Sequence, residues 1–157
     1  MSRLIIHGGK HLKGRHRVPG NKNAVLPMLA ACVLTDEPVC LRDVPLIDDV
    51  RTMLDILGDL GVSVELTGHT VTLCARSIRK SRLNPELCRK VRSSILFAGP
   101  LAARHGRATI FPPGGDVIGR RRLDTHFAAL SQLGISVATT HCYAFKSRRL
   151  RGARILL

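Results

Sequence analysis

The sequence contains no tryptophan, and aromatic residues make up only 3% of its 157 residues. Hydrophobic residues still account for 45% of the chain, so one core can form from leucine, isoleucine, valine and alanine. No apolar run reaches the ~18 residues that a membrane-spanning helix needs, and the N-terminus lacks the apolar stretch of a signal peptide. The sequence therefore predicts a globular, cytoplasmic chain with no membrane partner.

Cysteine is sparse and unpatterned. The five cysteines are odd in number, lie far apart and form no C-x-x-C pair: Cys32, Cys40, Cys74, Cys88 and Cys142. This pattern predicts reduced thiols and argues against a disulfide framework or a zinc site. The seven histidines show no ligand spacing either, so no metal site is predicted.

Acidic residues are few: 11 Asp and Glu stand against 25 Lys and Arg, which gives a net charge of +14. A strongly basic chain predicts an anionic partner, such as nucleic acid, acidic lipid or a phosphorylated small molecule. A basic nucleic-acid-binding module is the alternative that composition alone favours. The chain nevertheless lacks interleaved aromatic residues that would stack on bases, and it carries no known nucleic-acid-binding motif.

Two short segments recur at nearly one spacing, which indicates an internal duplication. The Leu-Ala-Ala of LPMLAA (26–31) returns 72 residues later in AGPLAA (98–103). LGVSVEL (60–66) is matched 73 residues later by LGISVAT (133–139). Because self-similarity at a fixed period marks repeated structural units, the sequence predicts two similar units in this chain.

Periodicity and turn residues predict the same order of elements in each half. The first half shows a helix over 23–34, a strand in PVCLRDV (38–44), a helix from Asp48 and Asp49 as caps to Gly61, and a hairpin around 67–69. The second half shows a helix over 91–105, a strand in ATIF (108–111), a helix ending at Gly134, and a hairpin from SVATT and CYAFKS. Strands joined by helical crossovers predict parallel pairing and an α/β class, with further strands at 15–18 and in the tail.

Several motifs in one order then carry a family resemblance. They are GNKNAVLP, DVPLIDDV, LGVSV, VRSSILFAGPLAARHG, PPGGDVIGRRRLDTH and LRGARILL. Together they resemble the enolpyruvyl transferases, specifically those that act on UDP-N-acetylglucosamine. The resemblance implies β-α-β-α-β-β units in an inside-out barrel fold. Residues 1–157 would supply two units, about 15–75 and 88–148, and with 149–157 the first strand of another.

The resemblance also implies a reaction. The family transfers the enolpyruvyl group of phosphoenolpyruvate to a sugar hydroxyl and releases phosphate, by addition and elimination through a tetrahedral intermediate. The methylene carbon is protonated by a general acid on a mobile loop. That position is cysteine in most members and corresponds here to Asp116, with Gly114 and Gly115 as the hinge. Resistance to fosfomycin, which alkylates the cysteine, is therefore expected, and no cofactor is implied.

Further site residues are implied one by one. Lys22, Asn23 and Arg121 match positions that bind phosphoenolpyruvate. The residues that match UDP-N-acetylglucosamine contacts are Arg92, Arg121, Arg122, Leu123, Asp124 and Thr125. Arg122 and Thr125 stand where many members have proline and leucine.

The chain covers well under half of such an enzyme. The resemblance implies that the aspartate base and further arginines lie in a missing C-terminal portion, supplied in the same chain or by a separate one. We therefore expect residues 1–157 to be inactive alone, and a non-catalytic remnant stays open as a second alternative.

Overall fold

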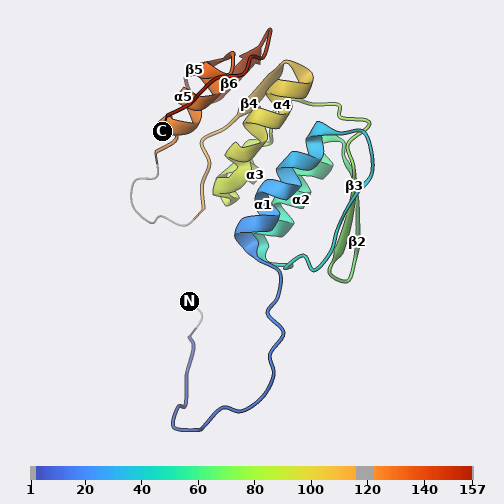
Figure 1. The fold of residues 1–157 in the computed structure, drawn as a ribbon, viewed down its shortest axis with the longest axis vertical. Helices are drawn as coiled ribbons and strands as arrows, with labels where there is room; N and C mark the ends of the chain where they lie inside the picture. The colour runs from blue at the N-terminus through green and yellow to red at the C-terminus, as the bar shows by residue number, and fades with distance from the viewer. Residues whose placement is uncertain (1–2, 116–121, 157) are drawn as a thin grey trace.

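The computed structural model describes residues 3–115 and 122–156, in which helices lie against two small sheets (Figure 1). The first half contains α1 (Lys22–Ala31), the 3₁₀ helix η1 (Cys32–Leu34), β1 (Val39–Leu41), α2 (Asp48–Leu60), β2 (Ser63–Thr67) and β3 (Thr70–Cys74). The second half contains α3 (Pro85–Lys90), the 3₁₀ helix η2 (Arg92–Phe97), α4 (Ala98–His105), β4 (Arg107–Ile110), α5 (Asp124–Gln132), β5 (Ile135–Thr139) and β6 (Tyr143–Ser147).

The two sheets have the same strand order, β1-β3-β2 and β4-β6-β5, and every pair within them is antiparallel. The α/β class is confirmed, but the predicted parallel pairing is wrong. Each hairpin folds its second strand back, so β3 lies between β1 and β2 and separates the two strands that run in the same direction. Among the described residues, one isolated parallel bridge, Arg82 to Thr109, joins the segment before α3 to β4. The predicted unit boundaries stay a prediction, which the matching strand orders support.

Helices α1 and α2 form where the sequence predicts them. The Asn21 side chain caps α1 by accepting a bond from the Asn23 N–H at 2.8 Å. The predicted capping of α2 by aspartate is wrong, because the N-cap is Ile47, whose side chain accepts no hydrogen bond, and both Asp48 and Asp49 lie in the first turn. There their charges favour the positive end of the helix dipole. Gly61, at φ 99°, ends α2 in the left-handed conformation, as predicted.

The prediction of a single helix over 91–105 is wrong. The structure has extended backbone at Val91, followed by η2 and then α4. Val91 has extended backbone angles and ends α3. The next six residues form η2 rather than an α-helix, and the Ser94 hydroxyl donates to the Val91 carbonyl at 3.0 Å. Serine side chains compete with the backbone for such bonds, which explains the break that apolar periodicity did not reveal.

The strands predicted at 15–18 and 149–157 are also wrong for the described residues. Residues 3–20 and 150–156 carry no strand, and the N-terminal segment runs away from the body (Figure 1). A strand needs a neighbour to complete its backbone hydrogen bonds, and no described strand lies beside either segment. Arg17 still pairs with Asp43 at 3.0 Å, and the Arg151 N–H donates to the Leu133 carbonyl at 3.1 Å.

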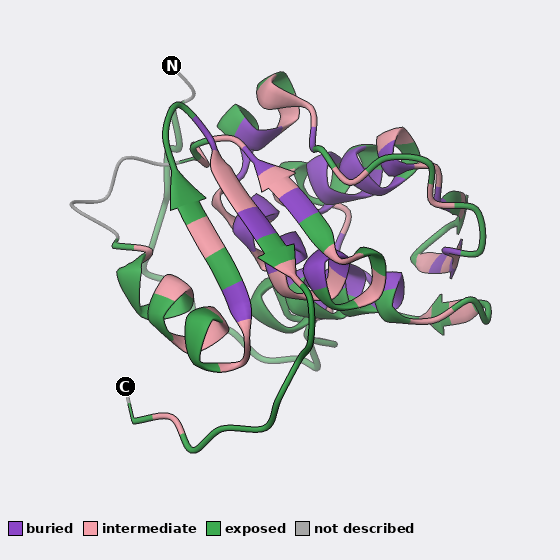
Figure 2. Ribbon diagram, turned by 90° about the horizontal axis from the view of Figure 1, so that it is seen from above, coloured by how far each residue is buried: buried purple, intermediate pink, exposed green. Residues whose placement is uncertain are grey.

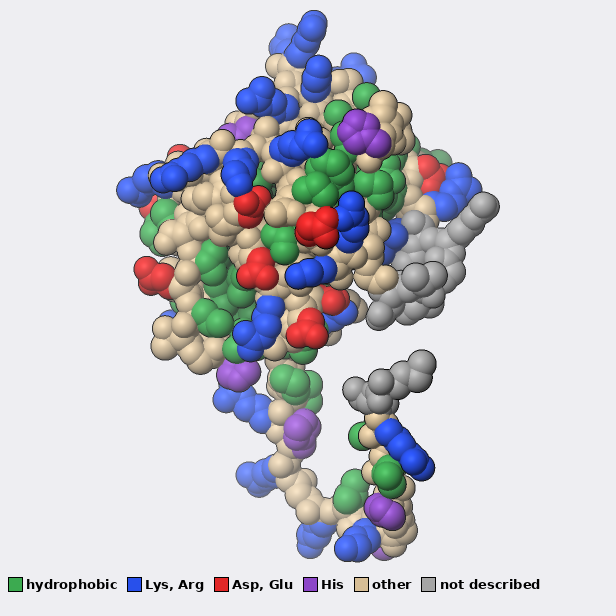
Figure 3. Space-filling model, turned by 180° about the vertical axis from the view of Figure 1, so that it is seen from behind, with side chains coloured by type: hydrophobic (Ala, Val, Ile, Leu, Met, Phe, Trp, Pro, Cys, Tyr) green, Lys and Arg blue, Asp and Glu red, His purple; other side chains and the backbone are tan. Residues whose placement is uncertain are grey.

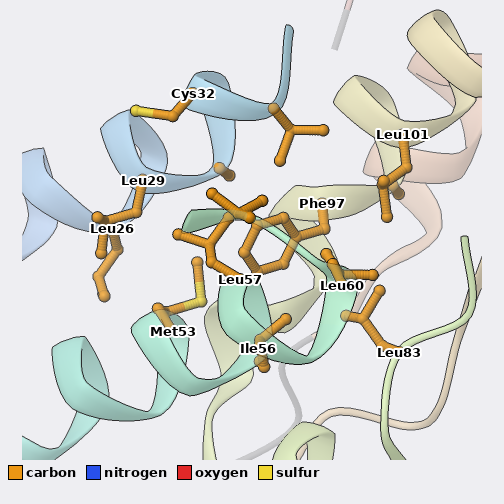
Figure 4. Packing of buried hydrophobic residues seen from close by; sticks show 14 of the residues in the cluster. Leu26, Leu29, Cys32, Met53, Ile56, Leu57, Leu60, Leu83, Phe97 and Leu101 are labelled. Atoms are coloured by element: carbon orange, nitrogen blue, oxygen red, sulfur yellow. The ribbon is translucent and has the colours of Figure 1, made fainter. Parts of the chain in front are cut away.

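One apolar cluster joins both halves of the chain. Figure 4 shows the Phe97 ring beside Leu57 and Leu60 of α2, near Leu29 of α1 and Leu101 of α4. All five side chains are fully buried. The buried residues of the second sheet alternate with exposed ones along the strands (Figure 2), as expected of strands with one face on the core. The two halves therefore stabilise each other through a shared core.

A partly buried arginine also ties the second half to the first. The Arg104 guanidinium, on α4, donates to the Val33 carbonyl at 2.6 Å and to the Thr35 carbonyl at 3.1 Å, and it pairs with Asp36. Its side chain is only 18% exposed. Because these carbonyls follow α1 and have no strand partner here, Arg104 supplies the bonds that would otherwise be missing at this junction.

Replacing Arg104 by alanine is expected to lower the free energy of unfolding by about 2 kcal/mol, because hydrogen bonds to a charged group are lost and the two carbonyls lose their partner. Urea denaturation followed by circular dichroism measures the change. Arg107→Ala, an exposed arginine at the start of β4, is the matched control and should change little. Equal losses in the two variants would contradict the role given to Arg104.

Charge is unevenly distributed over the surface. Figure 3 shows Asp and Glu side chains gathered on the central part of one face, with Lys and Arg side chains around them and along the N-terminal segment. Eight of the 11 acidic residues fall within 36–65, so one stretch of sequence accounts for most of the negative charge. The remaining surface is predominantly basic.

Candidate functional site

A hollow of about 590 Å³ opens where the starts of α1, α2, η2 and α5 meet the end of α3. Its walls come from α1, α2, α3, η2 and α5 and from the Pro-Gly-Gly segment after β4. The residues that line it are Lys22, Asn23, Leu26, Pro27, Asp49, Lys90, Arg92, Ser93, Ile95, Leu96, Gly115, Leu123 and His126. Four residues of the predicted site, Lys22, Asn23, Arg92 and Leu123, thus lie in one cavity although they come from distant parts of the sequence.

Lys22 is the first residue of α1, and its ammonium pairs with the Asp49 carboxylate in the first turn of α2. Both side chains are partly exposed to the hollow, 46% for Lys22 and 35% for Asp49. Asn23 lies beside Lys22, and its backbone N–H is held by the Asn21 cap. The start of α1 therefore presents a cation and an amide to the hollow, and the start of α2 presents the carboxylate that pairs with the cation.

Arg92 follows the extended Val91 and connects two walls of the hollow. One of its terminal nitrogens donates to the Arg122 carbonyl at 3.3 Å. Arg92 and Leu123 also line a second hollow of about 430 Å³, together with Pro112, Pro113, Arg122, Asp124, Phe127, Thr139 and Tyr143. The arginine thus lies at the boundary between the two cavities.

The Pro-Gly-Gly segment is fastened to the last turn of α3. The Gly114 N–H donates to the Cys88 carbonyl at 2.9 Å, and the Gly115 N–H donates to the Arg89 carbonyl at 3.2 Å. A Cβ at Gly114 would lie 1.7 Å from the Arg89 carbonyl oxygen, and Gly115 has a φ of 92°. The glycines are therefore needed for close backbone approach and a left-handed turn, which the sequence-based hinge interpretation did not include.

Asp116 and Arg121 lie outside the described residues, so their predicted roles stay predictions. After them, Arg122 pairs with Asp124 at 2.7 Å, and its hydrogen bond to Asp124 holds the pKa of that carboxyl below its usual value. Asp124 is the first residue of α5, whose N-cap is Leu123, so Asp124 is not the cap itself. Thr125 is exposed and lines neither hollow.

Several lining residues were not predicted. Asp49 was interpreted as a helix cap. The sequence did not predict Lys90, Ser93 or His126 as residues of the site. The Ser93 hydroxyl is buried and finds no hydrogen-bond partner among the described residues. The only available signal was adjacency, since Lys90 directly precedes the motif that begins at Val91 and Ser93 lies within it.

The described ranges, 3–115 and 122–156, meet neither the requirements of a metal site nor those of a membrane-spanning helix. No group of three or more His, Cys, Asp or Glu side chains there is arranged to hold a metal ion. No helix within those ranges is long and apolar enough to cross a membrane. All five cysteines are described and are free thiols, and burial raises the pKa of Cys32 and Cys88.

The chain is similar to known proteins along almost its whole length. The family described as EPSP synthase (3-phosphoshikimate 1-carboxyvinyltransferase) matches residues 6–156. UDP-N-acetylglucosamine 1-carboxyvinyltransferase of Bradyrhizobium diazoefficiens is 48% identical over 154 residues, which cover 98% of this chain and 36% of that relative. The enzyme of the same name from Treponema pallidum is 49% identical over 158 residues, which cover 100% of this chain and 37% of that relative.

Solved structures show the same fold. The enolpyruvyl transferase NikO from Streptomyces tendae matches with a TM-score of 0.78 at 21% identity, over 92% of this chain and 32% of that one. EPSP synthase from Acinetobacter baumannii matches with a TM-score of 0.68 at 19% identity, over 93% of this chain and 35% of that one. The chain thus spans little more than a third of the curated relatives it matches. It belongs to the EPSP synthase (3-phosphoshikimate 1-carboxyvinyltransferase) family, as a homologue of the N-terminal part of the UDP-N-acetylglucosamine 1-carboxyvinyltransferases.

Proposed function

We propose that this chain forms one wall of the active site of a UDP-N-acetylglucosamine enolpyruvyl transferase. The complete enzyme would move the enolpyruvyl group of phosphoenolpyruvate to UDP-N-acetylglucosamine and release phosphate, the first committed step of peptidoglycan synthesis. The observation that carries the proposal is the hollow that Lys22, Asn23 and Arg92 share with Gly115 and Leu123. The names of relatives 46–49% identical to this chain supply the substrates.

The charges of the hollow suit two anionic substrates. Lys22 offers a point charge and Asn23 an amide to phosphoenolpyruvate, and Arg121 adds a planar fork for its phosphate. Arg92, with the segment from Arg121 to Thr125, would contact the sugar nucleotide. Asp124 suits this role because an aspartate carboxylate can accept bonds from hydroxyl or N–H groups of the ligand.

Asp116 would protonate the methylene carbon of phosphoenolpyruvate. In the sequence it directly follows Gly115, which lines the hollow. A carboxyl with a reference pKa of ~3.9 must hold a proton to act as an acid, and the three arginines at 120–122 favour its charged form. Burial beside an anionic substrate acts in the opposite direction, which makes substrate binding part of the activation of the acid.

Residues 1–157 alone would not turn over. The chain holds little more than a third of the matched relatives, and the base and further arginines that the family resemblance implies lie in the remainder. Orientation of reactants in a complete site is worth roughly 7–11 kcal/mol, and most of this is lost when one wall is missing. A cytoplasmic location, as for the substrates of this reaction, remains part of the proposal.

A chimera tests the proposal. Residues 1–157 replace the matching segment of the Bradyrhizobium diazoefficiens relative, and phosphate release is measured with both substrates, beside the 157-residue chain alone. Turnover by the chimera and background release by the chain alone are expected. An inactive but folded chimera, together with a chain that binds neither substrate, would overturn the proposal. A salt-dependent shift with DNA in place of ligand binding would support the nucleic-acid alternative instead.

A further inference from the structure

We propose that Lys90 is a further anion-binding residue of the 590 Å³ hollow, where its ammonium would contact an oxyanion, phosphate or carboxylate, of a bound substrate. The inference deepens the proposed function and rests on it. Lys90 was not among the residues that the family resemblance implied, and it enters only through its place in the structure.

The backbone that carries Lys90 is fixed from two sides. α3 begins at Pro85 under the Asn84 cap, whose side chain accepts from the Glu86 N–H at 2.8 Å. Its end is held by the bonds from Gly114 and Gly115 to the Cys88 and Arg89 carbonyls. Lys90 is the next residue, and it lines the same hollow as Gly115. Its ammonium therefore starts from a rigid point on the cavity wall.

The positive charge of Lys90 has no acidic partner among the described residues that line the hollow. Among the described residues, three cations, Lys22, Lys90 and Arg92, line the hollow together with one carboxylate, Asp49, and that carboxylate pairs with Lys22. Within the ranges that the structure describes, Lys90 forms no ion pair or side-chain hydrogen bond. A cation that lies near other cations is repelled by them, and an anionic ligand beside Lys90 would offset that repulsion.

The ordinary role of such a lysine is weakened here. A lysine in the last turn of a helix commonly hydrogen-bonds the free carbonyls at that end. In α3 two of these carbonyls, those of Cys88 and Arg89, already accept bonds from the Pro-Gly-Gly segment. The ammonium is thus available to a ligand in the hollow.

The neighbouring arginine provides a matched control. Arg89 has the same charge and lies in the same turn, but it pairs with Glu86 and does not line the hollow. Lys90→Gln and Arg89→Gln therefore remove the same net charge from the same helix. Any difference between them reports on the hollow rather than on overall charge or helix stability.

Isothermal titration calorimetry of the 157-residue chain, with UDP-N-acetylglucosamine and phosphoenolpyruvate in separate arms, tests the inference. Lys90→Gln is expected to weaken one ligand about tenfold at low salt, Arg89→Gln less than about twofold, and Lys90→Arg to keep most of the affinity. The arm that loses affinity identifies the oxyanion. The difference should shrink with added NaCl, because the side chain is exposed.

The outcomes separate the two proposals. If the unmodified chain binds a substrate and Lys90→Gln binds it equally well in both arms, the role of Lys90 is overturned and the proposed function stands. If Lys90→Gln and Arg89→Gln weaken binding equally, the effect is one of net charge and the inference is also overturned. If the folded, unmodified chain binds neither substrate, the binding role of the hollow fails, and Lys90 with it.

Discussion

Asp116→Ala in the chimera is expected to lower kcat by about 10²–10⁴-fold, the usual contribution of a positioned general acid, while the Kd for UDP-N-acetylglucosamine changes little. The residues of the hollow that we propose bind the substrates, Lys22, Asn23 and Arg92, are untouched by this change. Single-turnover phosphate release measures the chemical step, and calorimetry measures the binding. Near-normal turnover of Asp116→Ala would show that the proton comes from another group.

Asp116→Cys is the matching control and should retain turnover. Its pH profile gives a second readout, because a general acid works only while protonated and activity falls as the pH rises through its pKa. The reference pKa of cysteine, ~8.5, lies far above that of aspartate, ~3.9. The falling limb of kcat should therefore move to higher pH in Asp116→Cys. An unchanged limb would mean that residue 116 is not the titrating acid.

The second large effect concerns fosfomycin. The unmodified chimera is expected to keep full activity after prolonged incubation with the epoxide, because a carboxylate is a much poorer nucleophile than a thiolate. Asp116→Cys should lose activity progressively, with first-order kinetics at excess inhibitor. The other cysteines do not confound the test, because the unmodified chimera carries every cysteine of the variant except the one at position 116.

Mass spectrometry completes the fosfomycin experiment. A single adduct on the peptide around residue 116 is expected in Asp116→Cys and in no other peptide. Prior binding of UDP-N-acetylglucosamine should change the rate if the sugar nucleotide occupies the neighbouring hollow. A covalent adduct at Asp116 in the unmodified protein would contradict the resistance argument.

Features set by local sequence were predicted well. α2 and both hairpins follow from helical spacing, from Gly61 as a stop and from short turns, all of which act within a few residues. The pairing of β1 with β3 was not predicted, because it depends on which strand a hairpin returns to the sheet. The strands expected at 15–18 and in the tail need neighbours that local propensity cannot supply.

The site was predicted in part, and for a different reason. Lys22, Asn23 and Arg92 came from motif resemblance, and the fold brings them into one hollow. Asp49 and Lys90 were missed because each has an ordinary helical explanation, at the start of α2 and at the end of α3. Only the three-dimensional arrangement shows that both face the same cavity, and charge balance then distinguishes their roles.

The tight contact of Gly114 with α3 bears on how this family can vary its chemistry. A side chain at 114 would collide with the Arg89 carbonyl, because the turn before residue 116 packs closely against the end of α3. Because backbone contacts hold this turn, residue 116 could be a cysteine or an aspartate without a change in the turn itself. The same contact makes the end of α3 sensitive to a substitution at Gly114. A substitution at Gly114 would push on the end of α3 and shift Lys90 and Arg92 together, disabling the site through its supports while every reactive group remained in place.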